Sequence, residues 1–213
     1  CFCDNAFKSF HTSAETGLFI TPSHHTVFSV MASFTIYLSF GERPVNLPVL
    51  TATAPVSVRI KGVTTGKIVD YGVKDSFNMG ACMAPAAADL IYQNLQDFDV
   101  KPTYYDRIIT GDLGKIGRKI LIDLLKDNGV DISRQHMDCG IEIFDNEEQD
   151  THSGGSGCGC SAITLAGYIL KQLREGSWKR VLFVPTGALL STVSYNEGQN
   201  IPGIAHGVII ERE

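Results

Sequence analysis

The chain reads DRIITGDLGKIGRKILIDLLKDNG from Asp106 to Gly129, and this stretch decides the class of fold. Asp106–Thr110 is a short apolar run, typical of a buried strand, and it ends in a Gly-Asp-Leu-Gly turn. In Lys115–Asn128 the apolar residues recur at helical spacing, and Gly129 supplies a C-terminal stop. The stretch therefore predicts a strand, a tight turn and an amphipathic helix. The predicted apolar face of that helix comprises Ile116, Ile120, Leu121, Leu124 and Leu125.

Strands and helices alternate on both sides of this stretch. Upstream, Val56–Tyr71 is rich in β-branched residues and is predicted to form a strand region. Pro85 is predicted at the first turn of a helix that continues through Ala86–Leu95. Downstream, a Gly-rich turn at 154–159 leads into a helix that ends at Gly176. The alternation predicts an α/β layered fold. The further predicted strands are Gly140–Phe144, Val181–Val184 and Gly207–Ile210.

The chain changes character near Pro55. Cys1–Ala54 shows no sustained helical or strand period, so we divide the chain into an N-terminal segment, residues 1–55, and an α/β unit, residues 56–213. Leu18–Phe40 contains no Lys, Arg, Asp or Glu, but Pro22 and repeated Ser and Thr interrupt it. A membrane span needs about 20 predominantly apolar residues. A pair of strands or a poorly specified segment is favoured over a span, and no signal peptide is expected.

The amino-acid composition limits the classes of protein to which the chain can belong. Hydrophobic residues make up 44% and charged residues 19% of the chain, which suits a packed core. The net charge is −5 and the basic residues are scattered, so no nucleic-acid partner is expected. The 6 cysteines are too few and too unevenly spaced for a disulfide framework, which favours a reduced, intracellular chain.

The segment Ser153–Ala162, SGGSGCGCSA, is the most informative candidate for binding. Small residues let a ligand approach the backbone, and the free N–H groups of the first helical turn suit a carboxylate or phosphate. The alternative is that these glycines only permit tight packing between helix and sheet. A single Gly-rich turn leaves both alternatives open.

Cysteines and histidines near this turn raise two further hypotheses. Cys158 and Cys160, with Cys139 nearby, are spaced poorly for zinc, so no metal site is expected and small buried thiols are favoured. A thiol at a helix N-terminus has a lowered pKa in principle, which makes Cys158 or Cys160 a candidate nucleophile. A base would then come from His136, His152 or His206, the last of which is more typical of a packing histidine. Asp112 follows a strand, where open α/β sheets bind ligands.

Several segments resemble the stage V sporulation protein AD family of spore-forming bacteria. The resemblance covers about Lys61 to Arg212 in register, so it does not rest on a single motif. The segments that carry it are Gly66–Val73, Met79–Asp89, Tyr105–Leu113, His136–Gly140, Gly154–Ala162, Thr186–Ser191 and Ile201–Val208.

The resemblance implies a thiolase-like layered fold of two similar halves, of which this chain looks like the C-terminal half. Residues 1–55 would then be a disrupted remnant of the first half. Condensing enzymes of the wider superfamily use a Cys from the first half and a His and an Asn from the second. Here Gly111-Asp112 stands at the His position and Cys158 at the Asn position. The resemblance therefore implies a non-catalytic protein, because an ionised Asp cannot donate a hydrogen bond to an oxyanion.

The function that the resemblance implies is binding of dipicolinic acid, or of calcium dipicolinate, for uptake into the developing spore. The expected partners are dipicolinic acid and other proteins of the stage V membrane complex, at the inner forespore membrane. No cofactor is expected. A lone half would also expose an apolar face, so we expect a homodimer or aggregate. The alternatives are an acyltransferase or condensing enzyme acting on coenzyme A thioesters, and an assembly subunit without a ligand. The candidate ligand-binding residues are Asp112, Leu113, Cys139, Gly154, Gly155, Ser156, Cys158, Cys160 and Ser161.

Overall fold

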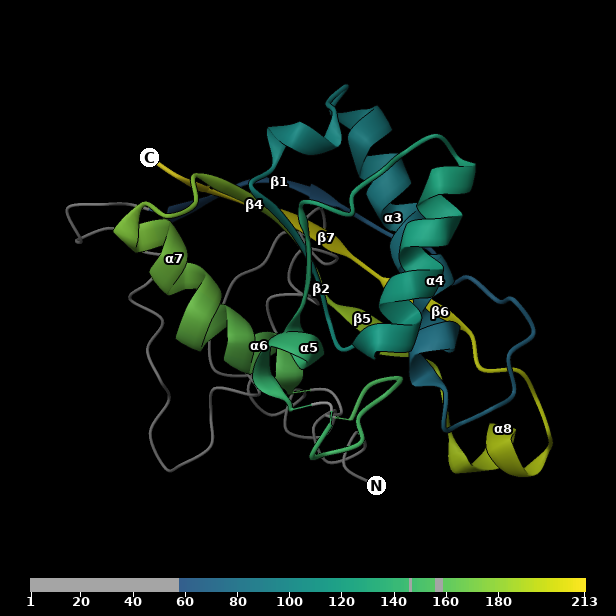
Figure 1. Ribbon diagram of the computed structural model, residues 1–213. Helices are drawn as coiled ribbons and strands as arrows, with labels where there is room; N and C mark the ends of the chain where they lie inside the picture. The colour runs from purple at the N-terminus through teal and green to yellow at the C-terminus, as the bar shows by residue number, and fades with distance from the viewer. Residues whose placement is uncertain (1–57, 146, 156–158) are drawn as a thin grey trace, which may run out of the picture. The chain divides into compact units, whose positions relative to one another are not determined.

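The computed structural model describes residues 58–145, 147–155 and 159–213. They form a five-stranded sheet with strand order β1-β7-β4-β2-β3 and a two-stranded sheet of β5 and β6 (Figure 1). The strands are β1 (Val58–Thr64), β2 (Arg107–Thr110), β3 (His136–Asp138), β4 (Arg180–Val184), β5 (Thr186–Ala188), β6 (Gly203–Ala205) and β7 (Gly207–Arg212).

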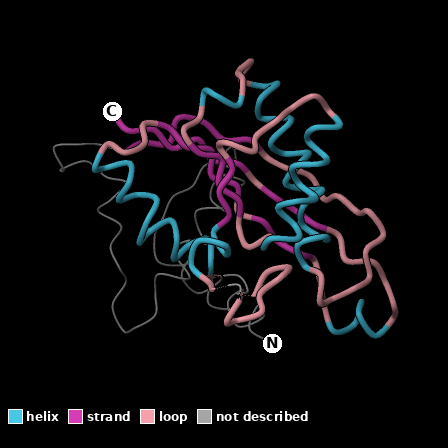
Figure 2. The backbone as a smooth tube through the Cα atoms, viewed as in Figure 1, coloured by secondary structure: helices cyan, strands magenta, loops and turns pink. Residues whose placement is uncertain are grey.

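The larger sheet is mixed. Strand β2 pairs in parallel with both β3 and β4, whereas β7 pairs antiparallel with β4 and β1. Figure 2 shows these strands running together through the centre of the described unit. The predicted fold class, α/β with a mixed sheet packed by helices, is confirmed.

Helices cover both faces of this sheet. Helices α3 and α4 lie side by side on one face, and the helical segment α6-η3-α7, which contains a π-helical turn (η3), lies on the other (Figure 1). The helices are α3 (Met79–Asp97), η2 (Pro102–Tyr104), α4 (Gly114–Asp127), α5 (Cys139–Ile143), α6 (Cys160–Thr164), η3 (Leu165–Ile169), α7 (Leu170–Glu175) and α8 (Thr192–Asn196).

Two glycines let α3 and α4 approach closely. A methyl group at Gly80 would lie 2.2 Å from the carbonyl oxygen of Leu113, and one at Gly117 would lie 2.8 Å from the Cα of Gly80. Any side chain at either position would therefore force the two helices apart. Below this contact, apolar side chains of both helices pack on the sheet. They include Leu90, Ile91, Leu121 and Leu125 from the helices, and Ile108, Leu182 and Ile209 from the sheet.

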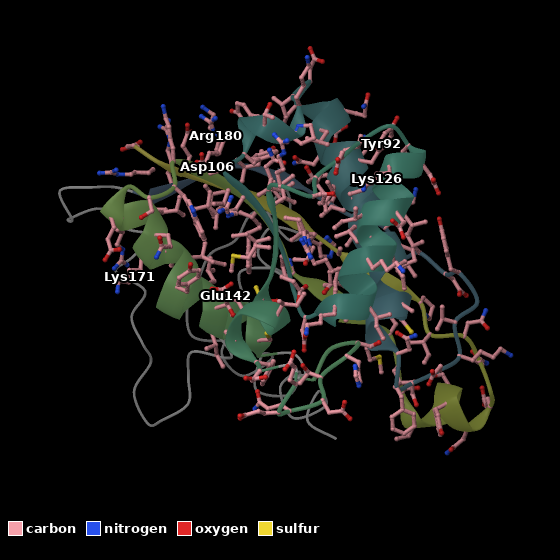
Figure 3. The ribbon with its side chains drawn as sticks, in the orientation of Figure 1. Tyr92, Asp106, Lys126, Glu142, Lys171 and Arg180 are labelled. Atoms are coloured by element: carbon pink, nitrogen blue, oxygen red, sulfur yellow. The ribbon has the colours of Figure 1, made fainter. Side chains whose placement is uncertain are left out.

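The carboxylate of Asp106 fixes the start of β4 beside β2. Its Oδ2 accepts hydrogen bonds from the backbone N–H of Lys179 at 2.7 Å and of Arg180 at 2.8 Å. Figure 3 shows Asp106 and Arg180 next to each other at this end of the sheet. The guanidinium of Arg180 also lies over the ring of Tyr104, 3.9 Å from its centroid. These contacts hold the strand pair in register before the strands reach the candidate site.

Trp178 joins the end of α7 to the sheet on the opposite face. Its ring meets that of Tyr168 edge to face at a centroid distance of 5.7 Å, and the guanidinium of Arg107 lies 5.7 Å from the Trp178 ring centroid. Tyr168 belongs to the π-helical turn and Arg107 to β2. One aromatic side chain therefore ties the irregular part of this helical segment to strand β2.

Several predicted elements are confirmed. The strand at Asp106–Thr110 is β2, and the helix predicted at Lys115–Asn128 is α4. The helix after the Gly-rich turn ends at Gly176, whose φ of 85° is the left-handed conformation that glycine allows. The strands predicted at Val181–Val184 and Gly207–Ile210 are β4 and β7.

Three details of the prediction are wrong. Gly140–Phe144 is not a strand, because the Asp138 side chain caps a short helix there by accepting a hydrogen bond from Ile141 N–H. Helix α3 does not begin at Pro85 but at Met79, where the Asn78 side chain caps it by accepting from Ala81 N–H. In α4, Ile116 is exposed and Gly117 is buried, because the helix face toward α3 must be small at the contact.

Two predictions fall on residues that the structure does not describe, namely the N-terminal segment 1–55 with its boundary, and the apolar run Leu18–Phe40. In the described part of the chain, no helix has both the length and the apolar character that a membrane crossing requires.

The α3–α4 contact predicts opposite effects for two Gly→Ala substitutions. Gly80→Ala should lower the free energy of unfolding by about 1–3 kcal/mol, because the new methyl group overpacks the contact. Gly167→Ala should raise it by about 0.5–1 kcal/mol, because that helical position has nothing within 4 Å of the added carbon. Urea denaturation of both variants measures the difference. Equal stabilities would show that the helices are not in close contact at Gly80.

Candidate functional site

The carboxyl ends of three parallel strands meet at one edge of the sheet. Strand β2 continues into Gly111 and Asp112, β3 into Cys139, and β4 into Pro185 and Thr186. Because β2 lies between the other two, its turn is flanked by residues from both sides. Ligands of α/β sheets bind beyond such strand ends, so this edge is the candidate site.

Asp112 connects the end of β2 to the Gly-rich loop. Its Oδ2 accepts a hydrogen bond of 2.8 Å from the backbone N–H of Gly155. A methyl group at Gly140 would lie 1.8 Å from Asp112 Oδ1, and one at Gly154 would lie 2.7 Å from the Asp112 carbonyl oxygen. Gly154 also has a φ of 99°, which disfavours any other residue. The glycines therefore make room for Asp112, and the structure brings Asp112, Gly154 and Gly155 together.

The loop that carries Gly154 and Gly155 is anchored to two helix N-termini. The carbonyl oxygen of Ser153 accepts from Gly80 N–H at 2.9 Å, and that of His152 accepts from Ile116 N–H at 3.1 Å. The Ser153 hydroxyl also donates to Asn78 Oδ1 at 2.8 Å. First-turn donors of α3 and α4 are thus already used by the protein.

A buried carboxylate lies beneath the turn. Asp138 accepts from Thr110 Oγ1 at 2.7 Å, from Leu113 N–H at 2.9 Å and from Gly114 N–H at 3.3 Å. Burial raises the pKa of Asp138 to about 6, and these hydrogen bonds act in the opposite direction. Leu113 itself is fully buried, so its side chain belongs to the core and its N–H to Asp138.

Two cysteines near the turn are buried: Cys139 and Cys160 are each less than a tenth exposed. Burial raises the pKa of the Cys139 thiol well above its usual value, with further contributions from Cys160 and Asp138. A raised pKa disfavours the thiolate, so Cys139 lacks the character of a nucleophile. Within the described residues no three His, Cys, Asp or Glu side chains form a group able to hold a metal ion.

The three candidate histidines occupy different environments. His136 is buried and lies 3.0 Å from Thr110 Oγ1, whereas His152 is exposed and pairs with Asp150. His206 accepts a hydrogen bond from Gly66 N–H through Nδ1 at 3.2 Å, and burial lowers its pKa. His206 is therefore a packing histidine with a backbone partner.

Two hydroxyl residues lie beside Gly111 in the turn. A methyl group at Gly111 would lie 2.5 Å from Thr186 Oγ1 and 3.1 Å from Ser161 Oγ. The Thr186 Oγ1 atom is buried and has no hydrogen-bond partner among the described residues. Ser161 was predicted as a site residue and Thr186 was not, although Thr186 follows the predicted strand Val181–Val184 by two positions. Ser156 and Cys158, the other predicted residues of the loop, lie outside the described chain.

The sequence of this chain is similar to that of stage V sporulation protein AD. The family model for stage V sporulation protein AD matches residues 47–211. Stage V sporulation protein AD of Bacillus subtilis (strain 168) is 45% identical over 164 residues, which are 77% of this chain and 48% of that protein. The chain thus spans about half the length of this curated relative. Among solved structures, the tetronic acid condensing enzyme AbyA1 aligns with a TM-score of 0.44 and 15% identity, over 76% of this chain and 50% of that chain.

Proposed function

This chain belongs to the stage V sporulation protein AD family, and from that membership we propose that it acts in sporulation by binding dipicolinate, alone or with calcium. The ligand lies at the edge where β2, β3 and β4 end, between the Asp112–Gly155 contact and the hydroxyls of Thr186 and Ser161. The protein takes up or hands on the ligand and does not transform it.

The Thr186 hydroxyl carries this proposal. Its buried Oγ1 lacks a hydrogen-bond partner in the described part of the chain, and a buried polar atom without a partner costs about 1–3 kcal/mol. A ligand carboxylate that accepts from this hydroxyl removes the penalty. The hydroxyl oxygens of Thr186 and Ser161 both lie within 3.1 Å of the place that a methyl group on Gly111 would occupy, so the two donors are close together. Dipicolinate has two such carboxylates on a flat ring.

Gly155 supplies the open side of the site. It is exposed, although a methyl group there would lie 2.6 Å from Thr151 Cγ2, so the Thr151 side chain bounds the backbone on one side. The exposed face of this backbone is where a planar molecule would lie, while the Gly155 N–H remains bonded to Asp112. The charge of Asp112 opposes a dianion unless calcium lies between them, since like charges in a partly desolvated site repel.

Isothermal titration of the 213-residue chain with dipicolinate, with and without calcium, tests the proposal. Thr186→Val keeps the side-chain shape and removes the hydroxyl, so it should weaken binding by about 10- to 100-fold, as expected for a hydrogen bond to a charged group. Thr103→Val, at an exposed position on η2, is the matched control and should leave affinity unchanged. Absence of heat with the unmodified chain in both conditions would reject dipicolinate as the ligand.

Asp112→Asn in the same titration separates the two forms of the ligand. The amide oxygen can still accept from Gly155 N–H, so the loop stays anchored while the charge is lost. Affinity for free dipicolinate should rise by on the order of fivefold, because a repulsion is removed. If calcium bridges Asp112 to the ligand, the same change should weaken binding only when calcium is present. Unchanged affinity in both conditions would place the ligand away from Asp112.

We also propose that the chain has no acyl-transfer activity. The position after β2 is occupied by Gly111 and Asp112 and not by a histidine, and the Cys139 thiol has a raised pKa. Acetyl-coenzyme A and acetoacetyl-coenzyme A should therefore be hydrolysed only at the uncatalysed rate. Release of free coenzyme A above that rate, lost in Cys139→Ala or Cys158→Ala, would establish an enzyme instead.

Assembly with other proteins of the stage V complex, peripheral to the inner forespore membrane, is proposed as the setting of this function. Large apolar side chains are exposed on the described surface, among them Phe77 at 91% and Val193 at 63%. Such surface favours association, including a homodimer. Sedimentation velocity of the chain should show self-association, and Phe77→Ser should reduce it. A monodisperse monomer at all concentrations would contradict this part of the proposal.

A further inference from the structure

A chain of buried polar side chains runs beneath the candidate site. Arg118 Nε donates to His136 Nδ1 at 3.3 Å, His136 Nε2 lies 3.0 Å from Thr110 Oγ1, and Thr110 Oγ1 lies 2.7 Å from Asp138 Oδ2. Thr110, His136 and Asp138 are each less than a tenth exposed. The chain of contacts joins α4, β3 and β2 and ends at the carboxylate under the turn.

The chemistry of the four groups assigns a direction to each contact. A guanidinium can only donate, so His136 Nδ1 is an acceptor and the ring proton is on Nε2. Nε2–H then donates to Thr110 Oγ1, which leaves the Thr110 hydroxyl hydrogen for Asp138 Oδ2. The Met137 carbonyl, 3.4 Å from Thr110 Oγ1, is the more distant acceptor. Burial, followed by the charge of Arg118, lowers the pKa of His136 to about 3, which agrees with a neutral ring.

The Asp138 carboxylate, at the end of this series of hydrogen bonds, binds backbone N–H groups of both α4 and α5. Asp138 accepts from Leu113 and Gly114 N–H at the start of α4, and from Ile141 N–H in α5. Asp112 directly precedes Leu113, and its own carboxylate fits against Gly140 and accepts from Gly155 N–H. A residue that served only to cap α5 would not also accept hydrogen bonds from the backbone of α4.

Ionisation of the Asp138 carboxylate costs stability relative to its protonated form. The pKa of Asp138, about 6, lies above the usual 3.8 mainly because of burial, with the charge of Asp112 acting in the same direction. A raised pKa means that the folded chain loses stability as pH rises from the unfolded value through about 6. At neutral pH the charged group therefore orders the turn at a cost in stability, which is typical of a functional position.

We propose that Asp138 is the positioning residue of the candidate site. Its hydrogen bonds hold the Gly111–Gly114 turn so that Asp112 presents its carboxylate to Gly155 in one orientation. The hydrogen bonds that run from Arg118 through His136 to Thr110 make the Thr110 hydroxyl the donor and the Asp138 carboxylate the acceptor. Asp138 itself touches no ligand. The consequence for ligand affinity rests on the function proposed above, whereas the consequence for the turn does not.

Nuclear magnetic resonance of the full 213-residue chain, labelled with 15N and without any ligand, tests the arrangement. Long-range 1H–15N spectra of the histidine rings should show His136 as the neutral Nε2–H tautomer, with no titration between pH 5 and pH 8. A His136 ring protonated on Nδ1, or charged at pH 7, would overturn the proposed direction of the hydrogen bonds.

Variants then test positioning through the amide resonance of Gly155, which reports the bond to Asp112. Asp138→Asn turns one of the two accepting oxygens into a donating NH2 group, whereas Asp138 accepts hydrogen bonds through both oxygens, so the Gly155, Leu113 and Gly114 resonances should shift. Asp131→Asn is the matched control, because Asp131 also accepts from a backbone N–H but lies at an exposed turn. Equal spectra of these two variants would overturn the proposal.

Two smaller substitutions, both at Thr110, test the same link if the Asp138→Asn variant does not fold. Thr110→Val removes the hydroxyl that links His136 to Asp138, and Thr110→Ser restores it. The Gly155 resonance should move in the valine variant and return in the serine variant. Movement in both or in neither would contradict the proposed link. Failure of dipicolinate to bind would reject the proposed function and leave this result standing.

Discussion

Strand β2 pairs in parallel with β3 on one side and β4 on the other, and the arrangement of the candidate site depends on this pairing. Parallel strands end at the same edge, so Asp112, Cys139 and Thr186 meet there although up to 74 positions separate them, as the difference between 186 and 112 shows. The Asp106 carboxylate holds the opposite end of the β2–β4 pair. Fixing one end of the pair fixes the position of the turn at the other.

Local patterns predicted the regular elements and failed where a tertiary contact decided the conformation. Helix α4 has a sustained helical period and a terminal glycine, and it was predicted nearly to its ends. The sequence 140–144, GIEIF, alternates as a strand does, but the Asp138 cap and the space that Asp112 needs at Gly140 make it a helix. Asp before a short apolar run is a capping signal, and it could have corrected the prediction. The start of α3 was missed because Gly80, a poor helix former, lies in its first turn, where close contact with α4 requires it.

The sequence indicated which segments lie near each other at the candidate site, but it did not indicate the hydrogen bonds between them. The rule that ligands bind beyond strand ends placed Asp112 near the Gly-rich loop, and the structure joins Asp112 to Gly155. The role of His136 was not predictable, because its partner Thr110 lies 26 positions away and only strand pairing brings them together. The same applies to Asp138, which reads as an ordinary surface aspartate until its burial is known. Burial and partner, not residue type, decide what these side chains do.

The contact of Trp178 with Tyr168 and Arg107 gives the chain an optical probe of its own architecture. Trp178 is the single tryptophan in the 213 residues, so its emission is free of overlap from any other indole. It lies where the helical segment that begins at Cys160 returns to the sheet, and it is 9% exposed. A shift of that emission toward longer wavelength therefore reports that the indole has lost its packing against Tyr168 and Arg107 and has become exposed to water.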